Sequence, residues 1–520
     1  MKKVLRSVFL FSFVLVLLFP LAAQETHKPG GIISDPDAAL KLLKEGNNRF
    51  VKNRLVQKKE YTLDRKEMIS GQHPFAVVLC CSDSRVSPEI IFDQHLGDLF
   101  VIRVAGNVLS DIELGSIEYA VDHLHAPLVV VVGHESCGAV TAVVDQITSA
   151  PEHAHALPKN IDAIAEQLRP ALFSALAKKN LNSGDPDKLK NFKKEILEET
   201  CDLNIRRMVG TIHADPMIRH GKTKVIGAKY MLDSGKVNWF APPKGIDHYK
   251  KLHKTEYSTA ALTPTVCALM NVPAPSICES DPIEPVLKKA QSVFVDHKPV
   301  QRALIFCPDA IGDLHREKYA KDFAPLLKET DFLMKGSNVM QSVTPVCFAT
   351  IFTGASPYIH GIEKYSKPVL KVETLFDVFL KANKKIAIIA VQNCSIEKIF
   401  RERNLDYFAT QSNEESFEKT KELLKKDIYD LIVSYDGGYD SSMHKTGVHS
   451  EASVNAMKKS IERYLALSKL TDTVWSKYNR ITLFAPDHGA HDTSNGKGAH
   501  GTESPDDMLV DHYYRLRPAK

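Results

Sequence analysis

Two cysteines and one histidine form the first group of residues that could hold a metal ion. Cys81 begins the motif CSDSR, and His134 and Cys137 lie in the motif GHESCG. Two thiolates and an imidazole favour a zinc-type ion. Three protein ligands leave one tetrahedral position open, which is typical of a catalytic rather than a structural metal site.

A second group of candidate ligands has harder donor atoms, because carboxylate oxygens take the place of thiolate sulfurs. Its members are Asp309, Asp440, His444, Asp487, His488 and His500. Three carboxylates and three imidazoles are enough ligands for two divalent metal ions. Asp436 is also within reach of this group, as a ligand, a substrate contact or a helix cap.

Short apolar segments precede both groups and predict the strands that position them. Residues 75–80 and 128–132 run directly into the first group. Residues 303–307, 431–435 and 481–485 precede members of the second group. In open α/β sheets the active site lies at the carboxyl ends of the strands. We therefore expect each group to come together at one edge of a sheet.

Unbroken runs of Val, Ile and Leu are typical of parallel strands that helices cover on both faces. Helical spacing of apolar residues alternates with these runs, at residues 39–51, 113–124 and 160–178 and again at 372–381 and 453–467. The pattern predicts an α/β protein with two domains, each a mainly parallel sheet flanked by helices.

The first group and its surroundings resemble the β-carbonic anhydrase family. CSDSR followed about fifty residues later by GHESCG carries the resemblance. The segments GDLFVIR (97–103) and AGN (105–107) between the two motifs, and VIGAKY (225–230) after them, extend it over nearly the whole first block.

This resemblance implies a β-carbonic anhydrase fold and reversible hydration of CO₂ to bicarbonate. Cys81, His134 and Cys137 would hold one zinc ion. Asp83 and Arg85 would form the dyad characteristic of the family, with Arg85 holding Asp83 off the metal in the open form. The family builds its substrate pocket across a dimer interface, so we expect a homodimer that forms through this block.

The second group resembles the alkaline phosphatase superfamily, in its nucleotide pyrophosphatase/phosphodiesterase branch. The motifs are TPVCFATIFTG from Thr344, HGI from His360, DSSMHKTG from Asp440 and DHG from Asp487. The resemblance runs over residues 303–514. It implies an alkaline-phosphatase-like fold that hydrolyses an unidentified phosphate ester.

In this resemblance Thr344 is a nucleophile that forms a covalent intermediate. Asp309, Asp487 and His488 would hold one ion, and Asp440, His444 and His500 the other. Zinc is the leading candidate for both ions. The alternative is a second domain that binds a ligand or docks a partner without turnover.

The length of 520 residues exceeds what one hydrophobic core usually supports. We expect a signal peptide at 1–24, the anhydrase domain at 35–242, a linker or lead-in segment at 243–300 and the phosphatase-like domain at 301–520. Pro and Gly at residues 242, 243 and 245 favour the seam.

The first residues predict export. Lys2, Lys3 and Arg6 precede an apolar run over residues 8–21. Small residues follow, as expected at the cleavage site of a signal peptide. The run is short for a membrane span, and no later segment is apolar enough to cross a bilayer, so we expect a periplasmic or secreted protein. A net charge of +4 with interleaved signs gives no signal of nucleic-acid binding.

Overall fold

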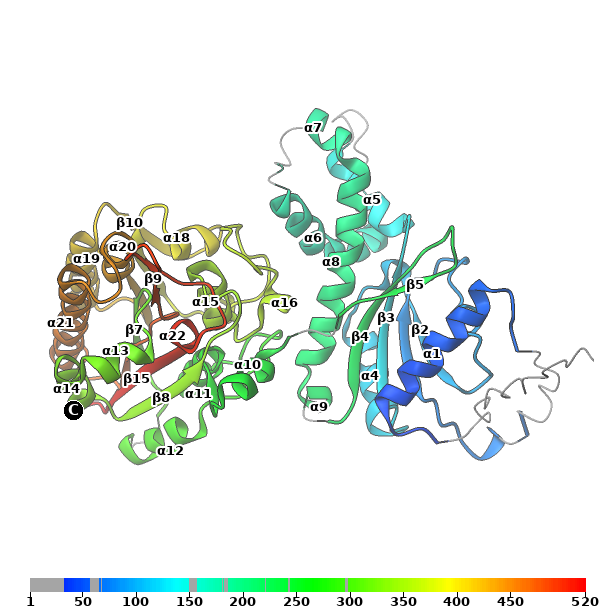
Figure 1. Ribbon diagram of the computed structural model, residues 1–520. Helices are drawn as coiled ribbons and strands as arrows, with labels where there is room; N and C mark the ends of the chain where they lie inside the picture. Colours follow the sequence, from blue (N-terminus) through cyan, green and yellow to red (C-terminus); the bar gives the residue numbers. More distant parts are fainter. Residues whose placement is uncertain are drawn as a thin grey trace, which may run out of the picture.

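The computed structural model describes residues 32–56, 65–66, 68–148, 157–179, 181, 186–219, 221–241, 244–294 and 298–520. Over these residues the chain is a mixed α/β protein with two large sheets, and most strand pairs in each are parallel (Figure 1). The expected signal peptide at 1–24 lies outside the described residues. No helix among the described residues is both long and apolar enough to span a membrane.

The first sheet has five strands in the order β2-β1-β3-β4-β5. Their bounds are β1 (Ala76–Cys80), β2 (Leu99–Arg103), β3 (Leu128–His134), β4 (Lys224–Tyr230) and β5 (Val237–Trp239). All neighbours run parallel except β4 and β5. The central strands β1 and β3 are buried along their whole length, as the unbroken apolar runs predict.

Helices cover both faces of this sheet because successive side chains of a strand point to opposite sides. The covering helices are α1 (Pro36–Val51) and α3 (Pro88–Ile91) on one face, and α4 (Asp111–Asp122) and α8 (Lys193–Ala214) on the other. In β1, Val78 and Cys80 pack toward α1 and α3. Val77 and Leu79 pack toward α4 and α8.

The second sheet has eight strands in the order β10-β9-β11-β7-β12-β15-β8-β6. Their bounds are β6 (Tyr257–Ser258), β7 (Arg302–Pro308), β8 (Phe332–Ser337), β9 (Ile386–Val391), β10 (Asp406–Thr410), β11 (Leu431–Asp436), β12 (Arg480–Phe484) and β15 (Leu509–Arg517). β15 is antiparallel to both of its neighbours, and the other pairs are parallel.

Two layers of helices enclose the second sheet. One layer includes α11 (Leu262–Leu269), α12 (Glu284–Val293), α15 (Thr344–Thr353), α17 (Leu375–Lys381) and α18 (Ser395–Ile399). The other includes α14 (Ala320–Glu329), α19 (Asn413–Lys426), α20 (Gly438–Thr446) and α21 (Glu451–Val474). Along β7, Ile305 faces the first layer and Phe306 the second.

The segment 243–300, expected as a linker or lead-in, is largely a folded part of the second half. It forms α10 (Ile246–His253), β6, α11 and α12. β6 pairs with β8, and Val266 and Ile283 are fully buried in the core against the second sheet. Most of this segment is therefore part of the second core, because its apolar residues pack there.

The two halves meet where α16 (Pro357–His360) packs on α8, which lies on the side of the first sheet facing the second half (Figure 1). Gly210 of α8 allows this close approach. A Cβ atom at position 210 would lie only 2.7 Å from Ile359 Cγ1.

Helix α8 also supports a loop of the first half through Asn204. Its buried side chain donates a 2.9 Å hydrogen bond to the carbonyl oxygen of Gly106. We expect Asn204→Ala to lower the free energy of unfolding of this half by about 1–3 kcal/mol, because a buried acceptor loses its partner. Urea unfolding measures the change.

The matched control is Lys194→Ala at an exposed position of α8. It also places alanine in this helix but removes no buried hydrogen bond. Equal urea midpoints for the two variants would contradict the support role of Asn204.

Candidate functional site

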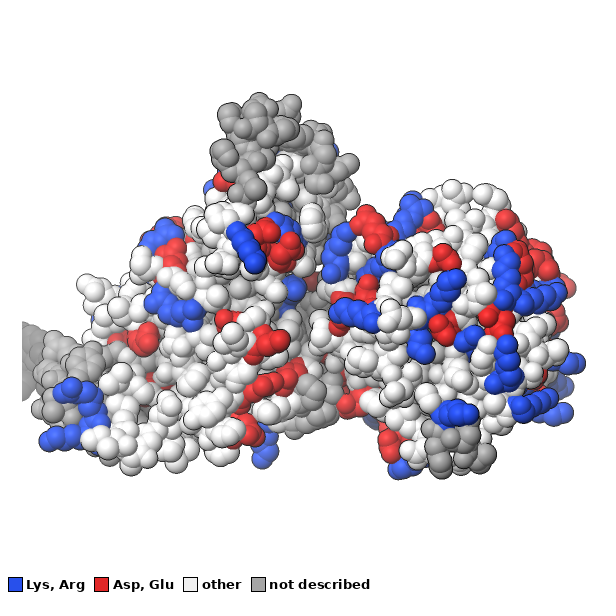
Figure 2. Space-filling view, turned by 180° about the vertical axis from the view of Figure 1, so that it is seen from behind, with Lys and Arg blue, Asp and Glu red and all other residues white. Residues whose placement is uncertain are grey.

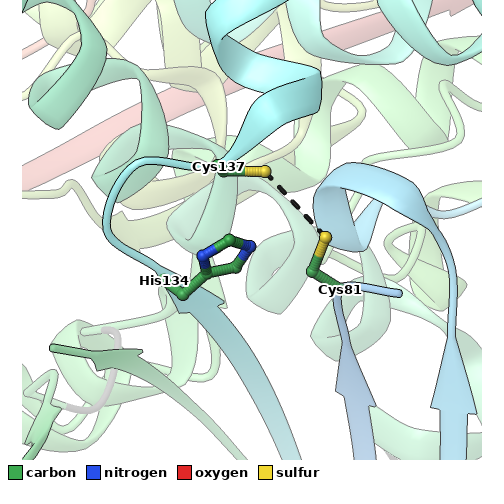
Figure 3. Close-up of side chains that lie close together, drawn as sticks. All are labelled: Cys81, His134 and Cys137. Carbon is green, nitrogen blue, oxygen red and sulfur yellow. Dashed lines mark hydrogen bonds between the residues drawn. The ribbon is translucent and has the colours of Figure 1, made fainter. Parts of the chain in front are cut away.

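Three side chains of the first half converge at the carboxyl edge of its sheet. Cys81 follows β1, His134 is the last residue of β3, and Cys137 precedes α5 (Gly138–Thr148). β1 and β3 are parallel neighbours, so their ends lie side by side. Figure 3 shows the two sulfurs and the imidazole ring gathered around one point.

The spacing of these three groups fits a tetrahedral zinc site. The two Sγ atoms lie 4.0 Å apart, and all three ligand atoms lie within 4.8 Å of one another. Zinc–sulfur bonds of about 2.3 Å at a tetrahedral angle place two sulfurs about 3.8 Å apart. His134 Nδ1 lies 2.8 Å from the carbonyl oxygen of Glu135 and donates to it. Its buried Nε2 then has no hydrogen-bond partner and is free to bind a metal.

The electrostatics of the site favour a thiolate at Cys81. The Cys137 thiol beside it, with the backbone N–H of Gly106 at 3.3 Å, lowers the pKa of Cys81 to about 4. The pKa of Cys137 is raised, because it shares a proton with Cys81 and is buried. A cation bound between the sulfurs would favour the thiolate form of both.

Asp83 lies beside the ligands and is held by Arg85. Arg85 Nε and Nη2 donate to the two carboxylate oxygens of Asp83 at 2.9 and 2.7 Å. This pairing holds the pKa of Asp83 well below its usual range. Asp83 Oδ2 is 3.9 Å from His134 Nε2. Arg103 donates to the carbonyl oxygen of Asp83 at 2.7 Å and so fixes the loop.

The comparisons with known proteins address this half of the chain. The family model described as carbonic anhydrase matches residues 76–237. A protein of Mycobacterium tuberculosis (strain H37Rv) named carbonic anhydrase 2 is 38% identical over 204 residues, covering 39% of this chain and 92% of that protein.

The chain belongs to the carbonic anhydrase family, in its β class. A carbonic anhydrase of Mycolicibacterium smegmatis is 51% identical over 114 residues, covering 22% of this chain and 55% of that protein. The structure of a β-carbonic anhydrase of Aspergillus fumigatus matches with 25% identity and a TM-score of 0.28, over 40% of this chain and 92% of that one.

Two residues support the carbonic anhydrase site from outside the ligand motifs. Asn204 holds the Gly106 loop, whose N–H donates to Cys81. Ile205 packs so closely on Gly133 that a Cβ there would lie 2.6 Å from its Cδ1. Neither residue carries a motif of its own, so sequence reasoning did not single them out.

The second half brings its six candidate ligands together as two adjacent clusters. In the first cluster, His488 Nε2 lies 3.4 Å from Asp309 Oδ1 and 3.3 Å from Asp487 Oδ2. All three side chains are buried. Asp309 follows β7, and Asp487 and His488 follow β12, a parallel neighbour of β7.

The second cluster contains Asp440, His444 and His500. Asp440 Oδ1 lies 3.2 Å from His444 Nε2 and 3.4 Å from His500 Nε2. Asp440 and His444 are one turn apart on α20, and His500 directly follows β14 (Gly498–Ala499). The rings of His488 and His500 are 4.1 Å apart between centroids, so the two clusters adjoin.

The charge balance of these clusters calls for cations. Asp309 Oδ1, Asp440 Oδ1 and Asp487 Oδ2 are buried without a hydrogen-bond partner, and they are the oxygens that face the histidines. Burial and the neighbouring carboxylates raise the pKa of Asp309 and of Asp487 well above the usual value. Divalent metal ions would supply the missing partners, so this donor set fits two of them.

Thr344 is the first residue of α15 and lies against the first cluster. Its Oγ1 is 3.3 Å from His488 Nε2. Here Pro345 has no N–H, and the N–H groups of Val346 and Cys347 donate to the carbonyl oxygen of Val343. The amino end of a helix carries partial positive charge. This position therefore suits a hydroxyl that meets an anionic phosphoryl group.

Two further residues position the clusters. Tyr435 donates a 2.5 Å hydrogen bond to Asp309 Oδ2, and Asn338 donates to the carbonyl oxygen of Asp487. The side chain of Asp436 belongs to neither cluster, because its oxygens accept from Arg463 at 2.7 Å and from the N–H of Gly438 at 3.0 Å. Its carbonyl oxygen accepts from the N–H of Asp309 at 3.0 Å. The N-cap residue of α20 is Gly437, and the Asp436 carboxylate accepts from the first N–H of that helix while it pairs with Arg463.

Metal binding to the second half should depend on pH. The raised pKa values of Asp309 and Asp487 mean that the metal-free carboxylates keep protons that a bound ion must displace. We expect the apparent affinity for Zn²⁺, measured over a pH range of about 5 to 8, to rise with pH and binding to release protons. Chelator competition measures the affinity for Zn²⁺. Calorimetry in two buffers with different ionisation heats measures the number of protons released.

These titrations use the variant Cys81→Ser, which removes one ligand of the metal site in the first half. Most of the measured Zn²⁺ binding then comes from the second half. An affinity for Zn²⁺ that stays constant over this pH range would contradict the prediction.

Proposed function

We propose that the first half catalyses the reversible hydration of CO₂ to bicarbonate and a proton. The observation that carries this proposal is the Cys81, His134 and Cys137 cluster, with an ionised carboxylate beside it. A zinc ion held by these three residues supplies, when bound, the Lewis acidity that makes hydroxide available near neutral pH.

Asp83 acts on the proton of the attacking water in this proposal. Its lowered pKa keeps the carboxylate ionised, so that it accepts a hydrogen bond and orients the oxygen. Arg85 holds both carboxylate oxygens, which is the arrangement expected of the open form. Val108 and Val140, buried beside the two sulfurs, give CO₂ an apolar surface.

We further propose that the chain is exported and acts as a homodimer. The basic start and the apolar run over residues 8–21 support export. Membership of a family that forms its pocket between two copies supports the dimer. Light scattering on the purified chain tests the dimer, and a mass of one chain would contradict it.

We propose a second activity, hydrolysis of a phosphate ester, for the second half. The observation that carries it is the pair of adjoining Asp/His clusters with Thr344 Oγ1 at 3.3 Å from one of them. Asp309, Asp487 and His488 would hold one ion, and Asp440, His444 and His500 the other. Bound ions supply positive charge for the phosphoryl oxygens and lower the pKa of a neighbouring alcohol.

Thr344 is the nucleophile of this proposed reaction. Its oxygen forms a bond to phosphorus while the bond to the leaving alcohol breaks, and the alcohol takes up a proton. Water then cleaves the phosphothreonine and releases phosphate, or a phosphate monoester when the substrate is a diester.

A ligand-binding second domain without turnover is the competing proposal, because buried clusters of this kind could also hold a phosphate or phosphonate ligand. The three clusters predict three ions per chain if both sites are loaded. One ion per chain would favour an anhydrase with a docking domain.

Cys137→Ser tests the first activity. We expect CO₂ hydration in a stopped-flow assay to fall by more than about 100-fold, because loss of a ligand exceeds the 10- to 100-fold cost of losing an outer-shell partner. Zinc content should fall with it. Cys201→Ser, at a buried thiol of α8 outside the ligand set, is the control. Unchanged hydration in Cys137→Ser would refute the assignment.

Thr344→Ala tests the second activity. We expect hydrolysis of p-nitrophenyl mono- and diesters to fall by at least about 1,000-fold, as for other enzymes that lose their nucleophile. Metal content and CO₂ hydration should stay unchanged, and Cys137→Ser should retain ester hydrolysis. Absence of turnover in the metal-loaded wild-type protein would favour the binding proposal instead.

A further inference from the structure

A cavity of about 480 Å³ lies between the two halves, away from both metal sites. One wall is formed by α8 and α6 (Lys159–Lys178), and the other by residues 358–372 of the second half. This volume falls within the usual range for small-molecule sites. It is several times larger than a simple inorganic anion.

The lining of this cavity is strongly cationic. Its charged residues are Lys178, Arg206, Arg207, Glu363, Lys364 and Lys371. Of the five cations, Lys178 and Lys371 pair with carboxylates outside the lining, so three cations face the single carboxylate. The surface in Figure 2 instead mixes both signs, as the net charge of +4 leads one to expect. The imbalance is a local property of the cavity.

The two arginines of this lining give the strongest indication of an anionic ligand. Among the residues that the structure describes, no carboxylate pairs with Arg206 or Arg207. Arg207 Nη1 donates to the carbonyl oxygen of Gln167 at 2.7 Å, and burial lowers its pKa with no anion to offset the effect. Lys178 and Lys371 differ, because they pair with Glu199 and Glu402. A guanidinium held in this way lacks its counter-ion.

A tyrosine adds an unpaired donor and an aromatic surface. The hydroxyl of Tyr358 is buried and has no hydrogen-bond partner. Arg206 lies over its ring, with the guanidinium carbon 5.5 Å from the ring centroid. Phe173 and Tyr365 also line the cavity. The cavity thus combines charged donors with rings on which a planar group could pack.

We propose that this cavity binds an organic phosphate: a phosphate group held by Arg206, Arg207 and the Tyr358 hydroxyl, joined to a planar or apolar part that fills the remaining volume. A guanidinium group suits phosphate oxygens because it donates several hydrogen bonds in a fixed geometry. The rest of the volume and its aromatic lining require more than inorganic phosphate.

Both catalytic halves contact this proposed site through elements that support their metal centres. α8 carries Arg206 and Arg207 next to Asn204, which holds the Gly106 loop. On the other side, His360 Nε2 lies 3.0 Å from Thr350 Oγ1 of α15, the helix that begins at Thr344. A ligand in the cavity would therefore bridge the two halves.

Calorimetric titration of the metal-loaded full chain carrying Thr344→Ala, which lacks the proposed nucleophile and so does not hydrolyse the probe, tests the proposal, with adenosine 5′-monophosphate (AMP), adenosine and inorganic phosphate as probes. We expect AMP to bind more tightly than either part alone. Arg206→Gln should weaken AMP binding about tenfold or more, since a charge-assisted contact is lost. Tyr358→Phe should weaken it by a smaller factor, and both variants should keep both activities.

Two controls separate this cavity from the catalytic sites and from general charge effects. Asp487→Asn disables the second metal site and should leave AMP binding at the cavity unchanged. Lys469→Gln removes an exposed lysine of α21 and should change nothing. AMP binding that survives Arg206→Gln but disappears in Asp487→Asn would overturn the proposal, as would no AMP binding at millimolar concentration.

Discussion

Acidic side chains buried close together at the carboxyl ends of strands are the constraint on which both halves depend. In the second half three carboxylate oxygens are buried without hydrogen-bond partners and face three imidazoles. In the first half two sulfurs lie 4.0 Å apart beside an unpartnered imidazole nitrogen. Such groups are costly in a protein interior unless a cation or a proton compensates them. The fold keeps them together because the strands that carry them are rigidly paired.

Parallel pairing concentrates these ligands, because all carboxyl ends of neighbouring strands lie at one edge. β1 and β3 place Cys81 and His134 side by side, and β7 and β12 do the same for Asp309 and Asp487. Both halves thus place their candidate ligands at the carboxyl ends of neighbouring parallel strands, but the ligand types differ. Thiolates and an imidazole suit a single zinc ion, whereas carboxylates with imidazoles suit a pair of ions.

Helices α8 and α15 link the two centres to the contact between the halves. α8 supports the Gly106 loop through Asn204, and its Gly210 admits Ile359 of the second half. α15 begins at Thr344 and is tied through Thr350 to His360, which lines the cavity between the halves. A change in how the halves meet would therefore act first on elements that position catalytic groups.

The sequence by itself determined most of the strands that present the candidate ligands. Strands expected at residues 75–80, 128–132, 303–307 and 481–485 lie within a residue or two of β1, β3, β7 and β12. Long apolar runs followed by His, Cys and Asp carry this information locally, since strand and loop residues are adjacent in the chain.

Only the tertiary structure decided what lies between these motifs. β15 is antiparallel to its neighbours, and residues 246–294 join the second core rather than linking two domains. Asn204, Tyr435 and the cavity at Arg206 act through partners that are mostly distant in sequence. No local pattern encodes such contacts, because they depend on which faces pack together after the sheets have formed.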